Sequence, residues 1–246
     1  MDLNTKYNNW FDSKYYHILY KNRNHKEAKV FIKKLIKHIN LSSSSKVLDA
    51  GCGKGRHSIE IEKLGHIVTG IDLSKNSIKF AKKFENTNLK FMVHDISKPL
   101  NSEFDVVLNL FTSFGYYERK KDLEILLSLE KNLKNNGTGV IDFFNLKNVK
   151  DNLIENEQVI IDNLKFNIKR KINKLSVTKE ISFNDNNIDY KFKESVNTLS
   201  FEDFEKYFKK TNLEIIQIFG DYDLNEFVEN KSPRLIIIFK KKSRSS

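Results

Sequence analysis

The 246-residue sequence contains little of what would cross-link or bend a chain: one cysteine, two prolines and nine glycines. Because Cys52 is alone, an internal disulfide is excluded, which fits a reducing compartment. No stretch approaches the roughly eighteen consecutive apolar residues that a membrane span needs. The first residues also lack the charged and apolar blocks of a signal peptide. We therefore expect a cytoplasmic protein without a membrane segment.

Arginine is also scarce, since only six of the 43 basic side chains are arginines. The formal net charge of +11 would nonetheless attract phosphate backbones. Arginine is the usual side chain for reading bases and for binding phosphate with two hydrogen bonds, and the lysines are spread along the chain. The charge therefore favours a generally solvated surface, with a nucleic-acid surface left open as the alternative.

Three of the few glycines stand at alternate positions directly after an apolar run. The run Lys46–Ala50 leads into Gly51, Gly53 and Gly55, with the small Cys52 as a spacer. A helical pattern follows over residues 58–64, and a second apolar run ends in Asp72. The predicted order is therefore strand, glycine turn, helix, strand and acid.

This order is typical of a nucleoside site in an open α/β sheet. Glycine tolerates positive φ and lets a ligand lie against bare backbone. The free N–H groups of a helix N-terminus favour a carboxylate or a phosphate. An acid after the second strand can accept hydrogen bonds from both ribose hydroxyls, and Asp72 lies nineteen positions beyond Gly53. The pattern predicts a cofactor site.

The glycine spacing distinguishes between cofactors. A dinucleotide loop reads Gly-x-Gly-x-x-Gly, whereas this loop reads Gly-x-Gly-x-Gly with Asp49 two residues before it. A carboxylate there would benefit an amino-acid ammonium and not a pyrophosphate. The segment Asp49–Gly55 resembles motif I of the class I S-adenosylmethionine-dependent methyltransferases, D/E-x-G-x-G-x-G. A third strand ending before Asp95 and a fourth strand leading into Asn109 extend the resemblance.

The resemblance implies a role for each candidate residue. The loop after the first strand would hold the methionine moiety, Asp72 the ribose and Leu73 the adenine face. Asp95 and Ile96 would read the adenine edge, and a basic side chain would pair with the cofactor carboxylate. The candidate cofactor-binding residues are Tyr16, Tyr20, Arg23, Asp49, Ala50, Gly51, Gly53, Arg56, Asp72, Leu73, Asp95, Ile96, Asn109 and Leu110.

The implied fold is α/β: a mostly parallel, Rossmann-like sheet with helices on both faces and an antiparallel C-terminal hairpin. We expect an N-terminal helical cap over 1–40 and a methyltransferase domain over 41–148 and 200–246. Short alternating runs with Asn- and Asp-rich turns predict an antiparallel β insert over 149–199, on the substrate side. Residues 135–139 form a turn cluster that opens a fifth strand at Val140, and Ser200 is a predicted N-cap.

The insert after the fifth strand resembles the subgroup that acts on small molecules, including amino-sugar N-methyltransferases. In that subgroup the layer roofs the substrate pocket and can contribute to homodimer contacts. Ser113, Tyr116 and Tyr117 follow the fourth strand, where the acceptor is expected, and are the candidate catalytic residues; ordinary core packing is the alternative for each. His57 is interpreted as a solvated residue at a helix start and His94 as a satisfied loop residue.

The implied activity is transfer of a methyl group from S-adenosylmethionine to a small molecule, with S-adenosylhomocysteine as the product. The motif region holds no strong base, which favours an amine nitrogen as acceptor. No Cys/His cluster has metal-ligand spacing, so no metal is expected. Three alternatives stay open: an RNA or protein methyltransferase, a non-catalytic S-adenosylmethionine-binding module, and an NAD enzyme.

Overall fold

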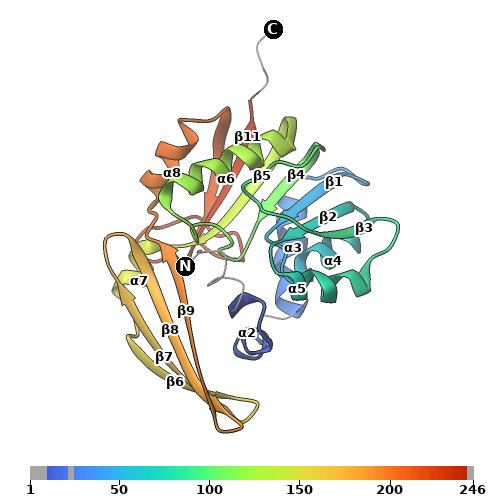
Figure 1. The fold of residues 1–246 in the computed structure, drawn as a ribbon. Coiled ribbons are helices and arrows are strands. Elements are labelled where there is room, and N and C mark those ends of the chain that lie inside the picture. The colour runs from blue at the N-terminus through green and yellow to red at the C-terminus, as the bar shows by residue number, and fades with distance from the viewer. Residues whose placement is uncertain (1–9, 22–24, 243–246) are drawn as a thin grey trace.

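The larger of two sheets forms the centre of the molecule. The computed structural model describes residues 10–21 and 25–242 (Figure 1). Seven strands pair in the order β10-β11-β5-β4-β1-β2-β3. All neighbours from β5 to β3 are parallel, and β11 is antiparallel to both β5 and β10. The strands are β1 (Lys46–Ala50), β2 (Ile67–Asp72), β3 (Leu89–Val93), β4 (Phe104–Asn109), β5 (Leu133–Phe144), β10 (Leu213–Phe219) and β11 (Arg234–Lys241).

Helices cover both faces of this sheet, so alternate side chains of one strand enter different cores. Val47 of β1 belongs to the cluster that includes Leu35 of α3, whereas Leu48 belongs to the cluster that includes Leu126 of α6. The strands are therefore apolar on both sides, as expected for a buried parallel sheet. The helices on the first face are α3 (His25–His38), α4 (Arg56–Glu62) and α5 (Lys75–Ala81), which runs into the 3-10 turn η1 (Lys82–Phe84); those on the second are α6 (Arg119–Asn132) and α8 (Phe201–Phe208). These observations confirm the predicted fold class.

The predicted insert is a separate four-stranded antiparallel sheet (Figure 1). It follows the short helix α7 (Leu146–Asp151), which the sequence pattern had not indicated. Its turns place Asp162, Asn163, Asn186 and Asn187 at positive φ, which two-residue hairpins require. The strands are β6 (Asn156–Ile161), β7 (Leu164–Ile172), β8 (Ser176–Asp185) and β9 (Ile188–Asn197).

The expected N-terminal cap divides between the two sheets. Helix α3 packs on the large sheet through Phe31, Ile32 and Leu35. Helix α2 (Lys14–Leu19) instead packs on the insert, where Trp10 and Tyr15 join Phe166, Ile168, Ile181 and Phe183 in a third apolar cluster. Residues 1–9 of the expected cap lie outside the described part. Over the described residues, no helix is long and apolar enough to cross a membrane.

The turn cluster at 135–139 lies within β5 and does not precede it. The strand begins at Leu133, which pairs with Phe104, and the next β4 pairing joins Val106 to Thr138. Residues 134–137 therefore bulge out opposite Asp105 alone, with Asn136 at φ 63. The Asn and Gly residues are suited to this backbone, so their composition indicated a local irregularity but not its position in the strand.

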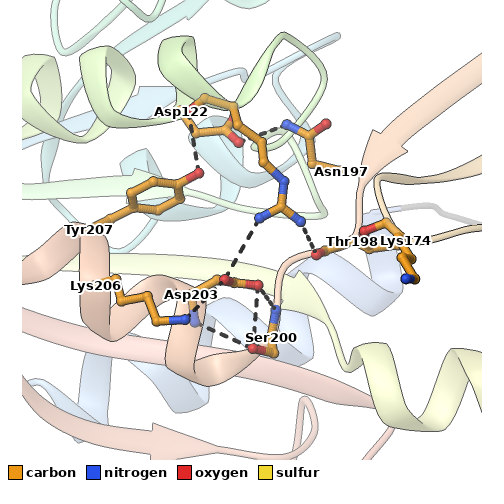
Figure 2. Close-up of polar contacts among 9 residues, drawn as sticks. Asp122, Lys174, Asn197, Thr198, Ser200, Asp203, Lys206 and Tyr207 are labelled. Carbon is orange, nitrogen blue, oxygen red and sulfur yellow. Dashed lines mark hydrogen bonds and ion pairs between the residues drawn. The ribbon is translucent and has the colours of Figure 1, made fainter.

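Ser200 is the N-cap of α8, as predicted. Its hydroxyl accepts from the Asp203 backbone N–H at 3.3 Å, and the Asp203 carboxylate accepts from the Ser200 N–H at 3.2 Å (Figure 2). This reciprocal capping box fixes where the chain returns from the insert to the large sheet. The helix ends at Phe208, two residues earlier than the periodicity predicted.

A buried carboxylate next to this cap connects the insert to α6 (Figure 2). Asp122 is fully buried, and its Oδ2 accepts from Asn197 Nδ2 at 2.7 Å. Its Oδ1 has no hydrogen-bond partner among the described residues. Arg119 on the same helix donates to the Thr198 carbonyl at 2.8 Å. Burial raises the pKa of Asp122 from 3.8 to about 7, against the hydrogen bond from Asn197 and the charge of Arg119.

We predict a pH dependence of stability from Asp122. Between about pH 4 and pH 7 the unfolded chain has released this proton while the folded chain retains it, so the free energy of unfolding falls as the pH rises. The Asp122→Asn variant should lack this component of the fall. Urea unfolding at pH 4, 5.5 and 7.5 measures it, with Asp151→Asn, an exposed carboxylate of α7, as control. A variant that follows the wild-type profile would contradict the assignment.

Candidate functional site

A cavity of about 440 Å³ lies at the carboxyl ends of β1, β2 and β4. Parallel strands end at the same edge of their sheet, so the loops after them meet there. The glycine loop, residues 72–74 and residues 110–113 line the cavity from the sheet side. Residues 10–21, which contain α2 and are termed the α2 segment, cover it. The candidate residues that line it are Tyr16, Tyr20, Gly51, Gly53, Arg56, Asp72, Leu73, Ile96, Leu110, Ser113, Tyr116 and Tyr117.

The glycine loop needs its glycines for two different reasons. Gly51, Gly53 and Gly55 have φ of 86°, 54° and 80°, which L side chains rarely adopt. A Cβ on Gly51 would lie 2.6 Å from the Ser113 Cβ, so this glycine permits a close approach of two loops. A Cβ on Gly53 would meet no atom within 4 Å. Gly53 therefore presents bare backbone to open space in the cavity.

Asp72 closes the loop from the end of β2. Its Oδ2 accepts from the Gly53 N–H at 2.9 Å and its Oδ1 accepts from the Ser74 N–H at 2.8 Å. Burial raises the pKa of this carboxyl, while hydrogen bonds from the Ser74, Gly53 and Leu73 backbone oppose the shift. Since each carboxylate oxygen has two lone-pair sites, both can accept one further hydrogen bond. The arrangement suits a ligand with two neighbouring hydroxyl groups.

Three other candidates lie behind the cavity wall instead of lining it. Asp49 is buried and accepts from the Ser58 hydroxyl at 2.6 Å, which attaches the start of α4 to β1; burial raises its pKa to about 6. The Ala50 carbonyl accepts from Asn109 Nδ2 at 2.7 Å, and Asn109 is fully buried. These residues support the glycine loop, because strand geometry directs their side chains into the protein.

Asp95 is also absent from the lining, although its neighbour Ile96 lines the cavity. Its Oδ1 accepts from the Ser97 N–H and hydroxyl at 2.9 and 2.8 Å, and Lys121 lies 3.7 Å from its Oδ2. Although burial alone would raise it, the Ser97 hydrogen bonds and Lys121 hold the pKa of Asp95 below its usual value. The remaining candidate, Arg23, lies outside the described residues.

The α2 segment is attached above the cavity at both ends. Asp12 Oδ1 accepts from Ser74 Oγ at 2.5 Å and from the Asn76 N–H at 2.8 Å, which joins the segment to the start of α5. At the other end Tyr20 donates to Glu194 of β9 at 3.2 Å. The insert itself contributes none of the described lining residues. It holds the cover in place, whereas the resemblance implied that the insert itself roofs the pocket.

Aromatic rings form much of the remaining wall. The lining includes Phe11, Tyr16, Tyr20, Phe111, Tyr116 and Tyr117. Phe11 contacts Tyr16 and Tyr116 with ring centroids 5.1 and 5.2 Å apart, which connects the cover to the loop after β4. Ser113 faces this wall, but its hydroxyl lies 2.8 Å from the Leu110 carbonyl and 3.2 Å from that of Gly51. Through these contacts Ser113 holds the loop after β4 against the glycine loop.

Several lining residues were not predicted from the sequence, and the surroundings of one histidine were predicted wrongly. His17 and Lys54 line the cavity, and burial followed by the charge of Lys54 lowers the pKa of His17 to about 4, so its imidazole is neutral near pH 7. His57 was expected to be solvated; it is buried and lines the cavity, because α3 packs over α4. His94 has its ring Nε2 2.9 Å from the Lys98 carbonyl, in agreement with a satisfied loop residue. No sequence motif marks His17 as a site residue, because its place on the cavity wall depends on the packing of α2 over the glycine loop.

Comparison with known proteins connects this geometry to a family. The family model described as a methyltransferase domain matches residues 41–194. The probable S-adenosyl-L-methionine-dependent methyltransferase TehB of Haemophilus influenzae is 31% identical over 103 residues, which are 40% of this chain and 36% of that protein. Ribosomal RNA small subunit methyltransferase A of Wigglesworthia glossinidia brevipalpis is 32% identical over 127 residues, 49% of this chain and 46% of that protein. The chain thus spans less than half the length of these relatives.

Solved structures share the whole architecture at low sequence identity. An S-adenosylmethionine-dependent methyltransferase from Clostridium acetobutylicum has a TM-score of 0.80 at 21% identity and covers 93% of this chain and 96% of its own. CalS10 from Micromonospora echinaspora, an amino pentose methyltransferase, has a TM-score of 0.69 at 15% identity, covering 94% and 98%. The matched family model, the glycine loop and this fold agree. The chain belongs to the class I S-adenosylmethionine-dependent methyltransferase family.

Proposed function

We propose that this protein transfers a methyl group from S-adenosylmethionine to the amine nitrogen of a small molecule. The observation that carries the proposal is the covered cavity, which has the glycine loop and Asp72 on one side and an aromatic wall on the other. A cavity of about 440 Å³ is within the range of small-molecule sites. Its cover restricts access for a large polymer.

The residues on the sheet side fit the nucleoside half of the cofactor. Asp72 offers one free acceptor site on each oxygen to the ribose hydroxyls, and Leu73 offers an apolar surface to the adenine. Gly53 leaves room for the ligand chain against bare backbone. Bound S-adenosylmethionine supplies a methyl group on a positively charged sulfur, and S-adenosylhomocysteine remains after transfer. Tyr16 and Tyr20 cover the site.

Arg56 is assigned to the carboxylate of the cofactor. It stands at the first position of α4, where the helix dipole also favours a negative charge. Its guanidinium lies 4.9 Å from the centroid of the Phe111 ring and 3.3 Å from Glu27 of α3. These two contacts orient the side chain along the cavity wall. Asp49 and Asn109 hold the loop beneath it and do not contact the ligand in this proposal.

The aromatic side supports an amine acceptor. Ring faces attract cations, so Tyr16, Tyr20, Tyr116 and Tyr117 would favour both a protonated amine and its methylated product. An oxygen nucleophile needs a general base, whereas an amine needs only to lose its proton. Asp72 is the only carboxylate among the described lining residues, and we assign it to the ribose; the other bases on this wall are the imidazoles of His17, near Lys54 and Asp12, and of the buried His57. The named activity of CalS10 on an amino pentose agrees with this choice.

An RNA or protein methyltransferase is the second candidate. The ribosomal RNA relative and the net charge of +11 favour it. Against it, α2 lies across the cavity, Lys21 on the lining is paired with Asp162, and we assign Arg56 to the cofactor carboxylate.

The proposal also includes a cytoplasmic location, the three-part domain division and a homodimer with contacts through the insert. Light scattering after size-exclusion chromatography tests the dimer.

Titration calorimetry should detect micromolar binding of S-adenosylmethionine and S-adenosylhomocysteine and none of NADH. The Asp72→Ala variant should bind S-adenosylhomocysteine at least about tenfold more weakly, because the ribose hydroxyls lose their shared acceptor. Asp105→Asn, at the opposite end of the sheet, is the control and should bind normally. Unchanged affinity in Asp72→Ala would remove this residue from the site, and no binding by the wild type would refute the proposed cofactor.

A panel of acceptors tests the amine assignment. With S-adenosylmethionine and the wild-type protein, we expect S-adenosylhomocysteine to accumulate with small amines or amino sugars. Catechols and ribosomal RNA should give only the rate observed without acceptor. Because an amine must be deprotonated to react, the rate should rise with pH up to the pKa of the accepted amine. Turnover on RNA alone would favour the second candidate.

A further inference from the structure

Two consecutive residues on the cavity wall have an unusual backbone. Phe111 and Thr112, which follow β4 after Leu110, both have φ of 57°. Neither is a glycine, and Thr112 is β-branched, so the left-handed conformation costs free energy at both positions. Both residues line the cavity. Strain of this kind persists only where surrounding contacts impose it.

Asp142 and Arg234 supply these contacts. Asp142 lies within β5, 1% exposed, between β4 and β11. Its Oδ2 accepts from the Phe111 N–H at 2.8 Å, and its carbonyl accepts from the Thr112 N–H at 2.9 Å. Arg234, the first residue of β11, donates from Nη2 to Thr112 Oγ1 at 2.9 Å. The N–H groups of both turn residues and the Thr112 hydroxyl are therefore fixed by residues of β5 and β11.

The two charged residues are also held by each other and by a tyrosine. Arg234 Nε and Nη2 lie 2.8 and 2.6 Å from Asp142 Oδ1, and the Tyr222 hydroxyl donates to Oδ2 at 3.0 Å. Replacing such a buried pair with apolar residues often leaves stability unchanged, so general stability is a weak reason for its presence. Its contacts with the turn are the specific feature that an apolar pair would not reproduce.

The turn in turn orients a side chain at the cofactor site. The Phe111 ring lies 4.9 Å from the Arg56 guanidinium, which the proposed function assigns to the cofactor carboxylate. Phe111 can hold this position only if its backbone keeps the left-handed conformation. Asp142 of β5 and Arg234 of β11 thus act on Arg56 through the Phe111–Thr112 turn. Because Arg56 is assigned to the cofactor carboxylate, the effect concerns the methionine end of the ligand and not its adenosine end.

We propose that Asp142 and Arg234 are positioning residues that fix the Phe111–Thr112 turn, and through Phe111 the Arg56 guanidinium, for the amino-acid end of the cofactor. The inference rests on the proposed function. It concerns binding alone, so it can be tested without knowing the acceptor. It distinguishes two ligands: S-adenosylhomocysteine carries the carboxylate, whereas 5′-methylthioadenosine has the same nucleoside and sulfur without it.

The test is titration calorimetry of both ligands with wild type, Asp142→Asn and Arg234→Lys. Asparagine cannot accept from both Phe111 and Arg234, and lysine has a single donor nitrogen, so it cannot reproduce the two nitrogens, Nε and Nη2, that Arg234 places on Asp142 Oδ1. We expect each variant to bind S-adenosylhomocysteine about tenfold more weakly and 5′-methylthioadenosine within about twofold of wild type. Asp105→Asn is the matched control, since Asp105 accepts from Lys134 at 2.6 Å and from the Lys46 N–H at 2.8 Å, and should change neither affinity.

The readout separates positioning from a general structural role. Thermal unfolding identifies a variant that is not folded, and the second variant then carries the test. Equal weakening of both ligands in folded variants, or no change in either, would overturn the inference while leaving the proposed function standing. If the wild type bound neither ligand, the proposed function itself would fail.

Discussion

The parallel alignment of β1 with β2 and β4 is the constraint on which the site depends. It places the ends of three strands at one edge of the sheet, and the glycine loop, Asp72 and the 110–113 turn meet there. Each loop is short because helices return the chain across the sheet. The backbone hydrogen bonds of the sheet thus fix the distances that the ligand site requires, before any side chain contributes.

A second group of contacts connects parts that are distant in sequence. Each uses a buried carboxylate: Asp142 joins β5 to the turn after β4, Glu194 joins the insert to α2, and Asp122 joins α6 to the insert. Burying a charge is costly unless its hydrogen bonds are satisfied. These carboxylates therefore lie where two elements must keep one relative position, and two of them, Asp142 and Glu194, contact residues that line the cavity.

Local patterns made much of the architecture predictable. The order of strands and helices, the antiparallel insert and the Ser200 cap follow from periodicity, turn residues and capping, all of which act over a few residues. The start of β5 was misplaced, because the same Asn and Gly residues suit a turn and a bulge equally well. Helix α7 was missed because six residues give too little periodicity to recognise.

The sequence alone determined that the glycine loop and Asp72 lie together, since a strand, a tight turn and a helix constrain about twenty residues of chain. Only the tertiary structure decided that α2 covers the cavity, that His57 is buried and that Asp95 and Asn109 lie behind the wall. It also decided that Asp142 and Arg234 act together on Phe111 and Thr112. The Arg234–Thr112 contact joins positions 122 residues apart and the Tyr20–Glu194 contact positions 174 residues apart, and no local periodicity encodes which distant surfaces will pack.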